Sequence, residues 1–218
     1  MRDGNYKMLL FDLGGVIIDI DPSITENKFK EISNRHGHNF KGLDYRHEKV
    51  SSDLTSLFFD YEQGFINDSE FRDGIRQIGK IDVSDEEIDN IWNLVIVKIN
   101  KTLLDQILIL RKKYSIMILS NTNNIHRVYF DSLVKKIYKK NFTDIFDRVF
   151  YSYEMRCRKP DKIIYQKVID SSGFKPDEIV FFDDMIENLT ECKKLGMNSH
   201  HVTDSKSLQK SLKGLINN

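Results

Sequence analysis

KMLLFDLGGVII, residues 7–18, places an aspartate and two glycines inside an otherwise apolar segment. The run Met8–Phe11 contains no polar residue, which is typical of a short strand that is buried on both faces of a parallel sheet. Asp12 ends this predicted strand, and Gly14 and Gly15 follow it. Because glycine adopts positive φ angles without strain, the pair predicts a tight turn at the carboxyl end of the strand.

Similar apolar runs recur along the chain and alternate with segments of helical periodicity. Two further runs predict strands strongly and two predict them weakly: 116–119 and 179–182, then 149–151 and 199–202. Helices are expected at 101–114, 125–140, 161–172 and 186–195. This alternation predicts an α/β fold with a Rossmann-like, doubly wound parallel sheet.

Residues 22–97 interrupt the alternation, because they contain helix signals and no comparable apolar strand. Asn67 and Ser84 each open a sequence that is typical of a helix start, and Ser84 has capping-box spacing to Glu87. We therefore expect an all-helical insert, a cap domain at 21–97, within an α/β core domain formed by 1–20 and 98–218.

Composition restricts the class of protein further. Of 218 residues, 33 are Lys or Arg and 33 are Asp or Glu, so the formal net charge is zero. This balance gives no indication of nucleic-acid binding. The sequence shows no span of about 20 apolar residues that would cross a membrane. Cys157 and Cys192 lie far apart without metal-site spacing. We expect reduced thiols and a cytoplasmic protein.

Each strong strand ends on polar residues that could perform chemistry. Asp12 follows the strand predicted at 8–11, Ser120 and Asn121 follow the one at 116–119, and Asp183 and Asp184 follow the one at 179–182. The carboxyl ends of parallel strands form the ligand crevice of such a sheet, so we expect these side chains to converge. Converging carboxylates repel one another unless a hard cation such as Mg²⁺ neutralises them. The segment 158–161, RKPD, supplies positive charge for a phosphate group.

Four segments in this order, FDLGGVIID, LSNTN, RKPD and FFDDMIEN, resemble the motifs of the haloacid dehalogenase (HAD) superfamily. The helical insert is similar to the small cap of its first subclass. Residues 61–75, YEQGFINDSEFRDGI, further resemble the cap of bacterial sugar phosphatases of the glucose-1-phosphate phosphatase type. The resemblance covers essentially the whole chain.

The resemblance implies a role for each matching residue. Asp12 matches the nucleophile, which forms an aspartyl-phosphate. Ser120 and Lys159 match catalytic residues that also bind the phosphate, and Gly15 and Asn121 match other substrate-binding positions. Four residues are implied at the Mg²⁺ site: Asp12, the backbone carbonyl of Gly14 and Asp184 match ligands, and Asp183 matches the outer-sphere neighbour of Asp184. Asn188 matches a polar residue that braces the second motif.

Gly14 departs from the pattern of the family's phosphatases, which carry a second aspartate there as a general acid and base. Such catalysis contributes about 10²–10⁴-fold in rate. Five residues are candidates for a substitute acid, although each is more typical of a turn or helix cap: Asp19, Asp21, His36, His38 and His47. Four cap residues are candidates for substrate contact: Tyr45, Arg46, His47 and Tyr61.

Three functions are consistent with Gly14. The first is a Mg²⁺-dependent phosphatase of a small phosphorylated metabolite, such as a sugar 1-phosphate, whose leaving group needs little protonation. The second is a non-catalytic protein that binds a phosphorylated ligand or a partner. The third is a 2-haloacid dehalogenase, against which the Asp183–Asp184 pair argues. The sequence does not indicate an oligomeric state.

Overall fold

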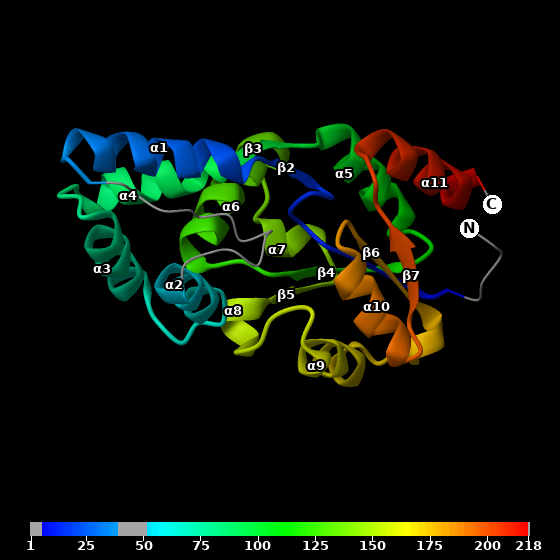
Figure 1. Cartoon of the computed structure of the whole chain (residues 1–218). Helices are drawn as coiled ribbons and strands as arrows, with labels where there is room; N and C mark the ends of the chain where they lie inside the picture. Colours follow the sequence, from blue (N-terminus) through cyan, green and yellow to red (C-terminus); the bar gives the residue numbers. More distant parts are fainter. Residues whose placement is uncertain (1–5, 39–51, 218) are drawn as a thin grey trace.

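The computed structural model describes residues 6–38 and 52–217, and it confirms the α/β fold (Figure 1). A sheet of five parallel strands has the order β5-β4-β1-β6-β7. The strands are β1 Met8–Phe11, β4 Ser115–Ser120, β5 Arg148–Tyr151, β6 Ile179–Asp183 and β7 Asn198–His201. From β1 the chain builds outward through β4 and β5, and then returns to β6 on the other side of β1. This is the doubly wound topology, and its crevice lies beside β1.

Helices cover both faces of the sheet, because alternate residues of each strand point to opposite sides. Leu9 and Phe11 pack with α5, α6 and α11, whereas Met8 and Leu10 pack with α9 and α10. The helices and short helical turns of this part are α5 Lys101–Leu110, α6 Asn124–Tyr138, α7 Phe142–Ile145, α8 Ser152–Met155, α9 Lys162–Ser172, η2 Pro176–Glu178, α10 Ile186–Lys194 and α11 Ser205–Asn217. Helix α5 is shorter than predicted, because a turn replaces its expected last residues, 111–114.

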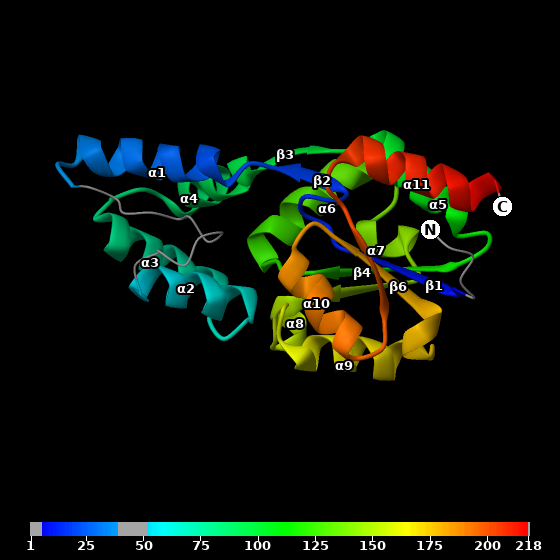
Figure 2. The ribbon, with the colours of Figure 1, turned by 45° about the vertical axis from the view of Figure 1, so that its right-hand side comes forward.

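A second group of helices lies beside the sheet and has its own apolar core (Figure 2). It contains α1 Pro22–Arg35, α2 Ser52–Glu62, α3 Asp68–Gly79, α4 Asp85–Trp92 and the 3₁₀ turn η1 Asn93–Val95. Phe29, Phe71 and Ile88 are completely buried in this core. Asn67 forms a full capping box with Glu70, while Ser84 accepts one hydrogen bond from the Glu87 N–H. The cap domain at 21–97 and the core domain at 1–20 and 98–218 remain our proposal.

The structure adds a strand pair that the sequence did not predict. Strands β2 Ile18–Ile20 and β3 Ile96–Ile99 pair antiparallel where the chain enters and leaves the helical group. The expectation of no strand within 22–97 was therefore wrong at its last residues. Among the helices that the structure describes, none combines the length and apolar character needed to cross a membrane.

Candidate active site

The polar strand ends meet at the carboxyl edge of the sheet because of the strand register. Phe11 is paired with Phe182 on one side and with Ile118 on the other. Asp12 therefore lies between the ends of β4 and β6, and its N–H donates to the Phe182 carbonyl at 2.8 Å. Carboxylate oxygens of Asp12, Asp183 and Asp184 all lie within 4.8 Å of one another. The predicted convergence of the acids is present.

Lys159 lies among these acids and is only 2% exposed. Its Nζ atom is 2.8 Å from Asp12 Oδ1 and 2.8 Å from Asp183 Oδ2. Asn121 holds the lysine backbone in place, because its Nδ2 donates to the Lys159 carbonyl at 2.9 Å and its Oδ1 accepts from the Lys159 N–H at 2.8 Å. These two hydrogen bonds join the segment LSNTN to the segment RKPD. The side chain of Asn121 positions Lys159.

The charges of this cluster do not balance, because three carboxylates face one ammonium group. Burial raises the pKa of Asp12 to about 8, with the Lys159 ammonium opposing this shift and Asp183 and Asp184 adding to it. Burial opposes the charge of Lys159, but Asp12 and Asp183 outweigh it and raise the lysine pKa. Burial first, and the neighbouring carboxylates second, therefore destabilise the ionised form of Asp12. A cation bound by the carboxylates would relieve the repulsion among them.

Asp183 and Asp184 have different surroundings. Asp183 is fully buried, and its oxygens accept from the Met185 N–H at 2.7 Å and from Asn188 Nδ2 at 3.0 Å. Asp184 instead lines a cavity together with Asp12. The hydrogen bonds of the Asn188 side chain join it to Asp183 rather than to the second motif, which corrects the prediction for that residue.

The turn after Asp12 brings the chain close to Asp184. Gly15 has a φ angle of +77°, and a Cβ atom built on it would lie 2.4 Å from Asp184 Oδ2. Its N–H donates to the Ile18 carbonyl at 2.9 Å. Gly14 lines the cavity, whereas Gly15 is not among the residues that line it. The roles predicted for both glycines stay predictions, and the structure adds a steric one for Gly15.

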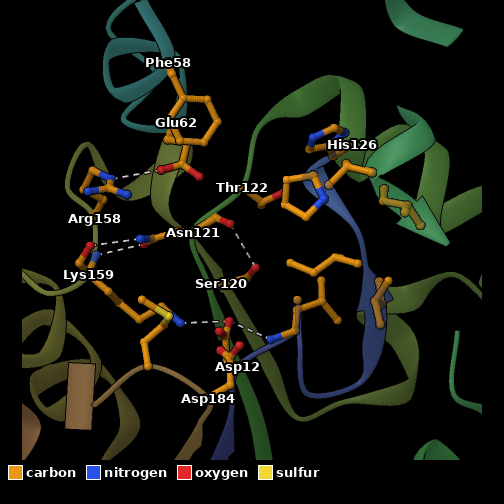
Figure 3. Close-up of a pocket in the computed structure, with 18 of the residues that line it drawn as sticks. Asp12, Phe58, Glu62, Ser120, Asn121, Thr122, His126, Arg158, Lys159 and Asp184 are labelled. Carbon is orange, nitrogen blue, oxygen red and sulfur yellow. Dashed lines mark hydrogen bonds and ion pairs between the residues drawn. The ribbon is translucent and has the colours of Figure 1, made fainter. Parts of the chain in front are cut away.

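A cavity of about 480 Å³ opens above Asp12 and reaches the helical group (Figure 3). Ser120, Asn121, Lys159 and Asp184 line it with Asp12. Much of its remaining wall is apolar and comes from both parts of the molecule: Ile18, Ile20, Pro22, Phe58, Phe59, Trp92, Val95, Ile96, Phe130, Pro160 and Met185. Other polar residues of the lining are Thr25, Glu62, Thr122, His126, Arg158, Glu187 and Asn188.

None of the proposed substitute acids that the structure describes lines this cavity. Asp21 caps α1 and accepts from the Ser23 N–H, and Asp19 lies 3.3 Å from Lys98 in an ion pair. His36 and His38 are exposed, and His47 lies outside the described residues. Tyr61 is buried and donates to Asp68 at 2.7 Å, away from the cavity lining. Tyr45 and Arg46 also lie outside the described residues.

Sequence reasoning missed two titratable residues that line the cavity around the cluster, Glu62 and His126. Glu62 is the last residue of α2, and His126 lies in the first turn of α6. The ring of His126 is stacked on Trp92 at 5.0 Å, and its Nδ1 is 3.0 Å from Asn93 Oδ1. The only available signal for His126 was its position shortly after the LSNTN motif. Glu62 lies in the segment 61–75 that resembles a sugar-phosphatase cap, but nothing in the sequence indicates that its side chain faces the cavity, because the face that a helix presents depends on tertiary packing.

A buried carboxylate cluster at the switch point of a doubly wound sheet, covered by a helical insert, defines a class of enzyme that also appears in a comparison with known families. The model of the haloacid dehalogenase-like hydrolases matches residues 6–196, and the chain belongs to this family. The predicted family membership is therefore confirmed.

Three bacterial proteins match the chain over nearly its whole length. It is 28% identical over 211 residues to a D-ribitol-5-phosphate phosphatase of Bacteroides thetaiotaomicron, which covers 97% of this chain and 98% of the relative. A crystal structure of a HAD-family enzyme from the same species, in complex with magnesium and inorganic phosphate, matches with a TM-score of 0.78 and 34% identity, over 90% of this chain and 93% of that one. A predicted HAD-like hydrolase of Porphyromonas gingivalis matches with a TM-score of 0.84 and 25% identity, over 99% and 100% of the two chains.

Proposed function

We propose that this protein is a Mg²⁺-dependent phosphatase that hydrolyses a small phosphorylated metabolite through an aspartyl-phosphate. The observation that supports this most directly is the position of Asp12, whose Oδ1 lies 2.8 Å from Lys159 at the floor of a cavity. A solvent-shielded nucleophile beside a fixed positive charge suits attack on a phosphate ester. The magnesium and phosphate complex of the Bacteroides HAD-family enzyme supports the same chemistry.

The donor set at this site fits magnesium. Asp12, Asp183 and Asp184 offer carboxylate oxygens within 4.8 Å of one another, and Mg²⁺ prefers oxygen ligands. We propose that Asp12, Asp184 and the Gly14 carbonyl hold the ion, with Asp183 behind them. When bound, the ion would offset negative charge on the carboxylates and the phosphate.

The residues of the chain divide the work of hydrolysis. An Asp12 oxygen attacks phosphorus, the ester P–O bond breaks, and the departing oxygen takes up a proton. Water then attacks phosphorus and releases Asp12 and inorganic phosphate. Lys159 offsets charge on the phosphate and holds Asp12 in place, while Ser120 can donate its hydroxyl hydrogen to a phosphate oxygen. The apolar cavity walls exclude bulk water during the first step.

The substrate class follows from two observations. Gly14 has no carboxyl to protonate the leaving group, which favours a sugar 1-phosphate, because its anomeric oxygen leaves more easily than an ordinary alkoxide. The name of the D-ribitol-5-phosphate phosphatase points instead to a sugar-alcohol phosphate. Both belong to one class, a phosphate ester of a neutral polyhydroxylated body. We propose this class, with the 1-phosphate as the better leaving group.

We also propose a cytoplasmic location and small-molecule partners rather than nucleic acid. Cys157 and Cys192 are free and buried, as expected of reduced thiols. The equal numbers of acidic and basic residues support small-molecule partners rather than nucleic acid.

The test compares the wild type with Asp12→Asn on p-nitrophenyl phosphate and on glucose 1-phosphate and ribitol 5-phosphate, each with Mg²⁺ or with EDTA. We expect Mg²⁺-dependent phosphate release that Asp12→Asn lowers by at least about 10³-fold, because the amide cannot act as nucleophile. Asp19→Asn is the matched control, since Asp19 lies outside the cavity lining, and it should keep the wild-type rate. Release that survives both EDTA and Asp12→Asn would show that the site is assigned wrongly.

A further inference from the structure

An ion pair joins the cap helix α2 to the core at the end of the cavity away from Asp12. Arg158 Nε donates to Glu62 Oε2 at 2.9 Å, and both residues line the cavity. In Figure 3 this pair lies on the opposite side of Asn121 from Asp12 and Asp184. Arg158 directly precedes Lys159, so the two cations of this loop serve opposite ends of one cavity.

Glu62 is buried and Arg158 is half-buried, and the pair is incompletely hydrogen-bonded. The side chain of Glu62 is 8% exposed and that of Arg158 is 23% exposed. The guanidinium group lies 4.0 Å over the Phe59 ring, which fixes its plane. Within the described part of the chain, neither terminal nitrogen of Arg158 nor Oε1 of Glu62 has a hydrogen bond. Burying two charges for a single hydrogen bond is a poor way to gain stability, because desolvation opposes the attraction.

The chemistry of the unused atoms selects the ligand. Arg158 can donate hydrogen bonds and the Glu62 carboxylate can accept them, so adjacent hydroxyl groups can satisfy both residues. The pair has no net charge. A second anionic group on the substrate would be repelled by Glu62, and an ammonium group would be repelled by Arg158. Phe59 lies under the Arg158 guanidinium group, and Phe58 and Trp92 also line the cavity, so apolar surface is available for the C–H face of such a ligand.

We propose that Glu62 and Arg158 form the specificity site for the hydroxyl groups of the substrate, at the end of the cavity opposite the phosphate. The proposal rests on the phosphatase function and deepens it, because it assigns recognition of a neutral polyhydroxylated body to two residues. Arg158 then has a different role from Lys159, which holds the phosphate.

The same ion pair would have a different effect if it only fastened the cap to the core. A fastening role affects every substrate equally, since cap closure is common to all of them. A specificity role affects only those substrates that carry hydroxyl groups, because a site built to hydrogen-bond a hydroxyl discriminates against analogues that lack it. Comparing substrates with and without hydroxyl groups separates the two roles.

The experiment measures kcat and KM of Glu62→Gln and Arg158→Gln on glucose 1-phosphate, ribitol 5-phosphate and phenyl phosphate with Mg²⁺. We expect kcat/KM for the hydroxylated ester that the wild type prefers to fall by about 30–100-fold, mainly through KM. The loss for phenyl phosphate should be at least about tenfold smaller. Asp89→Asn is the control, because Asp89 pairs with Arg72 at 2.7 Å within the helical group and outside the cavity lining. This substitution should leave the KM of every one of these substrates unchanged.

Equal losses on phenyl phosphate and on the hydroxylated esters would overturn the specificity role and leave the phosphatase function intact. Binding of the hydroxylated esters to Asp12→Asn, with and without Glu62→Gln, separates the two claims further. If the wild type hydrolyses no ester but Glu62→Gln still weakens binding at least tenfold, the proposed function fails and the recognition site stands. If Glu62→Gln leaves binding unchanged in a folded protein, the recognition site fails, and Arg158→Gln checks this result independently.

Discussion

Gly15 makes room for a carboxylate, and this role differs from the usual use of glycine in a turn. Its φ angle of +77° needs glycine for conformational reasons, but the same is true of Gly173, at +78°. An added Cβ at Gly15 would lie 2.4 Å from a carboxylate oxygen of Asp184, whereas a Cβ added at Gly173 would meet nothing within 4 Å beyond its chain neighbours. Gly15 and Gly173 have the same backbone conformation, so a substitution at Gly173 adds backbone strain alone, whereas one at Gly15 adds strain and a steric contact with Asp184.

Replacing Gly15 by alanine should weaken magnesium binding, because the new methyl group displaces Asp184. Both Gly15→Ala and Gly173→Ala should lower the free energy of unfolding by about 1–2 kcal/mol, the strain of a positive φ. Only Gly15→Ala should raise the Mg²⁺ concentration needed for half-maximal activity, by about tenfold or more. Urea unfolding measures the first effect and Mg²⁺ titration of phosphatase activity the second. Equal Mg²⁺ requirements in the two variants would refute the steric role of Gly15.

At the scale of elements, the central strands could be predicted and the ribbon beside them could not. Strands β1, β4 and β6 are continuous apolar runs because helices cover both of their faces. Strands β2 and β3 form a separate two-stranded sheet, and Asp19 and Lys98 interrupt their short apolar pattern. The convergence of Asp12, Ser120 and Asp183 could be predicted from their positions at strand ends, because the carboxyl ends of parallel strands lie at one edge of the sheet. Glu62 follows no such rule, since its helix is placed by packing that involves residues distant in sequence.

The first turn of α6 holds a histidine whose charge should affect stability. Burial lowers the pKa of His126 to about 3, below the usual value of about 6.5 in an unfolded chain. Between these values the unfolded chain binds the extra proton, so stability falls as pH is lowered. Acidification from about pH 7 to pH 5 should remove up to about 2 kcal/mol through this group. His126→Gln should lose this part of the pH dependence.

Urea unfolding of the wild type and His126→Gln at both pH values measures the difference, and all other titrating groups cancel in the comparison. His126 is half-buried rather than buried, so the measured value should lie below the upper bound of about 2 kcal/mol. An identical pH dependence in both proteins would show that His126 titrates normally in the folded state.

Across the whole molecule, the helical group α1–α4 also meets the α/β part at contacts outside the cavity. The β2–β3 ribbon provides the covalent connection. Two hydrogen bonds form a second, non-covalent connection near the end of α2. Asn124 Nδ2 donates to Asp68 Oδ2 at 2.8 Å, and Tyr61 accepts from the Ile125 N–H at 3.3 Å. Under the proposed function, a helical group that closes over the phosphate would have to loosen these contacts to release product.

Ser152 is the buried residue that connects these parts most directly. Its Oγ donates to the Glu62 carbonyl at 2.6 Å and accepts from the Thr122 N–H at 3.0 Å, and the residue is 0% exposed. Ser152→Ala would leave both backbone groups without this partner, which should lower the free energy of unfolding by about 1–3 kcal/mol. Because one of these groups belongs to α2, amide exchange in that helix should also become faster.

Ser132→Ala is the matched control for this change, since the exposed Ser132 hydroxyl donates to the Tyr129 carbonyl at 2.7 Å within α6. It should change stability by less than about 0.5 kcal/mol and leave exchange in α2 unaltered. If Ser152→Ala lowers stability but exchange in α2 stays at the wild-type rate, Ser152 supports the core alone. Faster exchange confined to α2 and the adjoining loop would instead place the cap–core contact at Ser152, next to Glu62, where cap closure and substrate recognition depend on the same helix end.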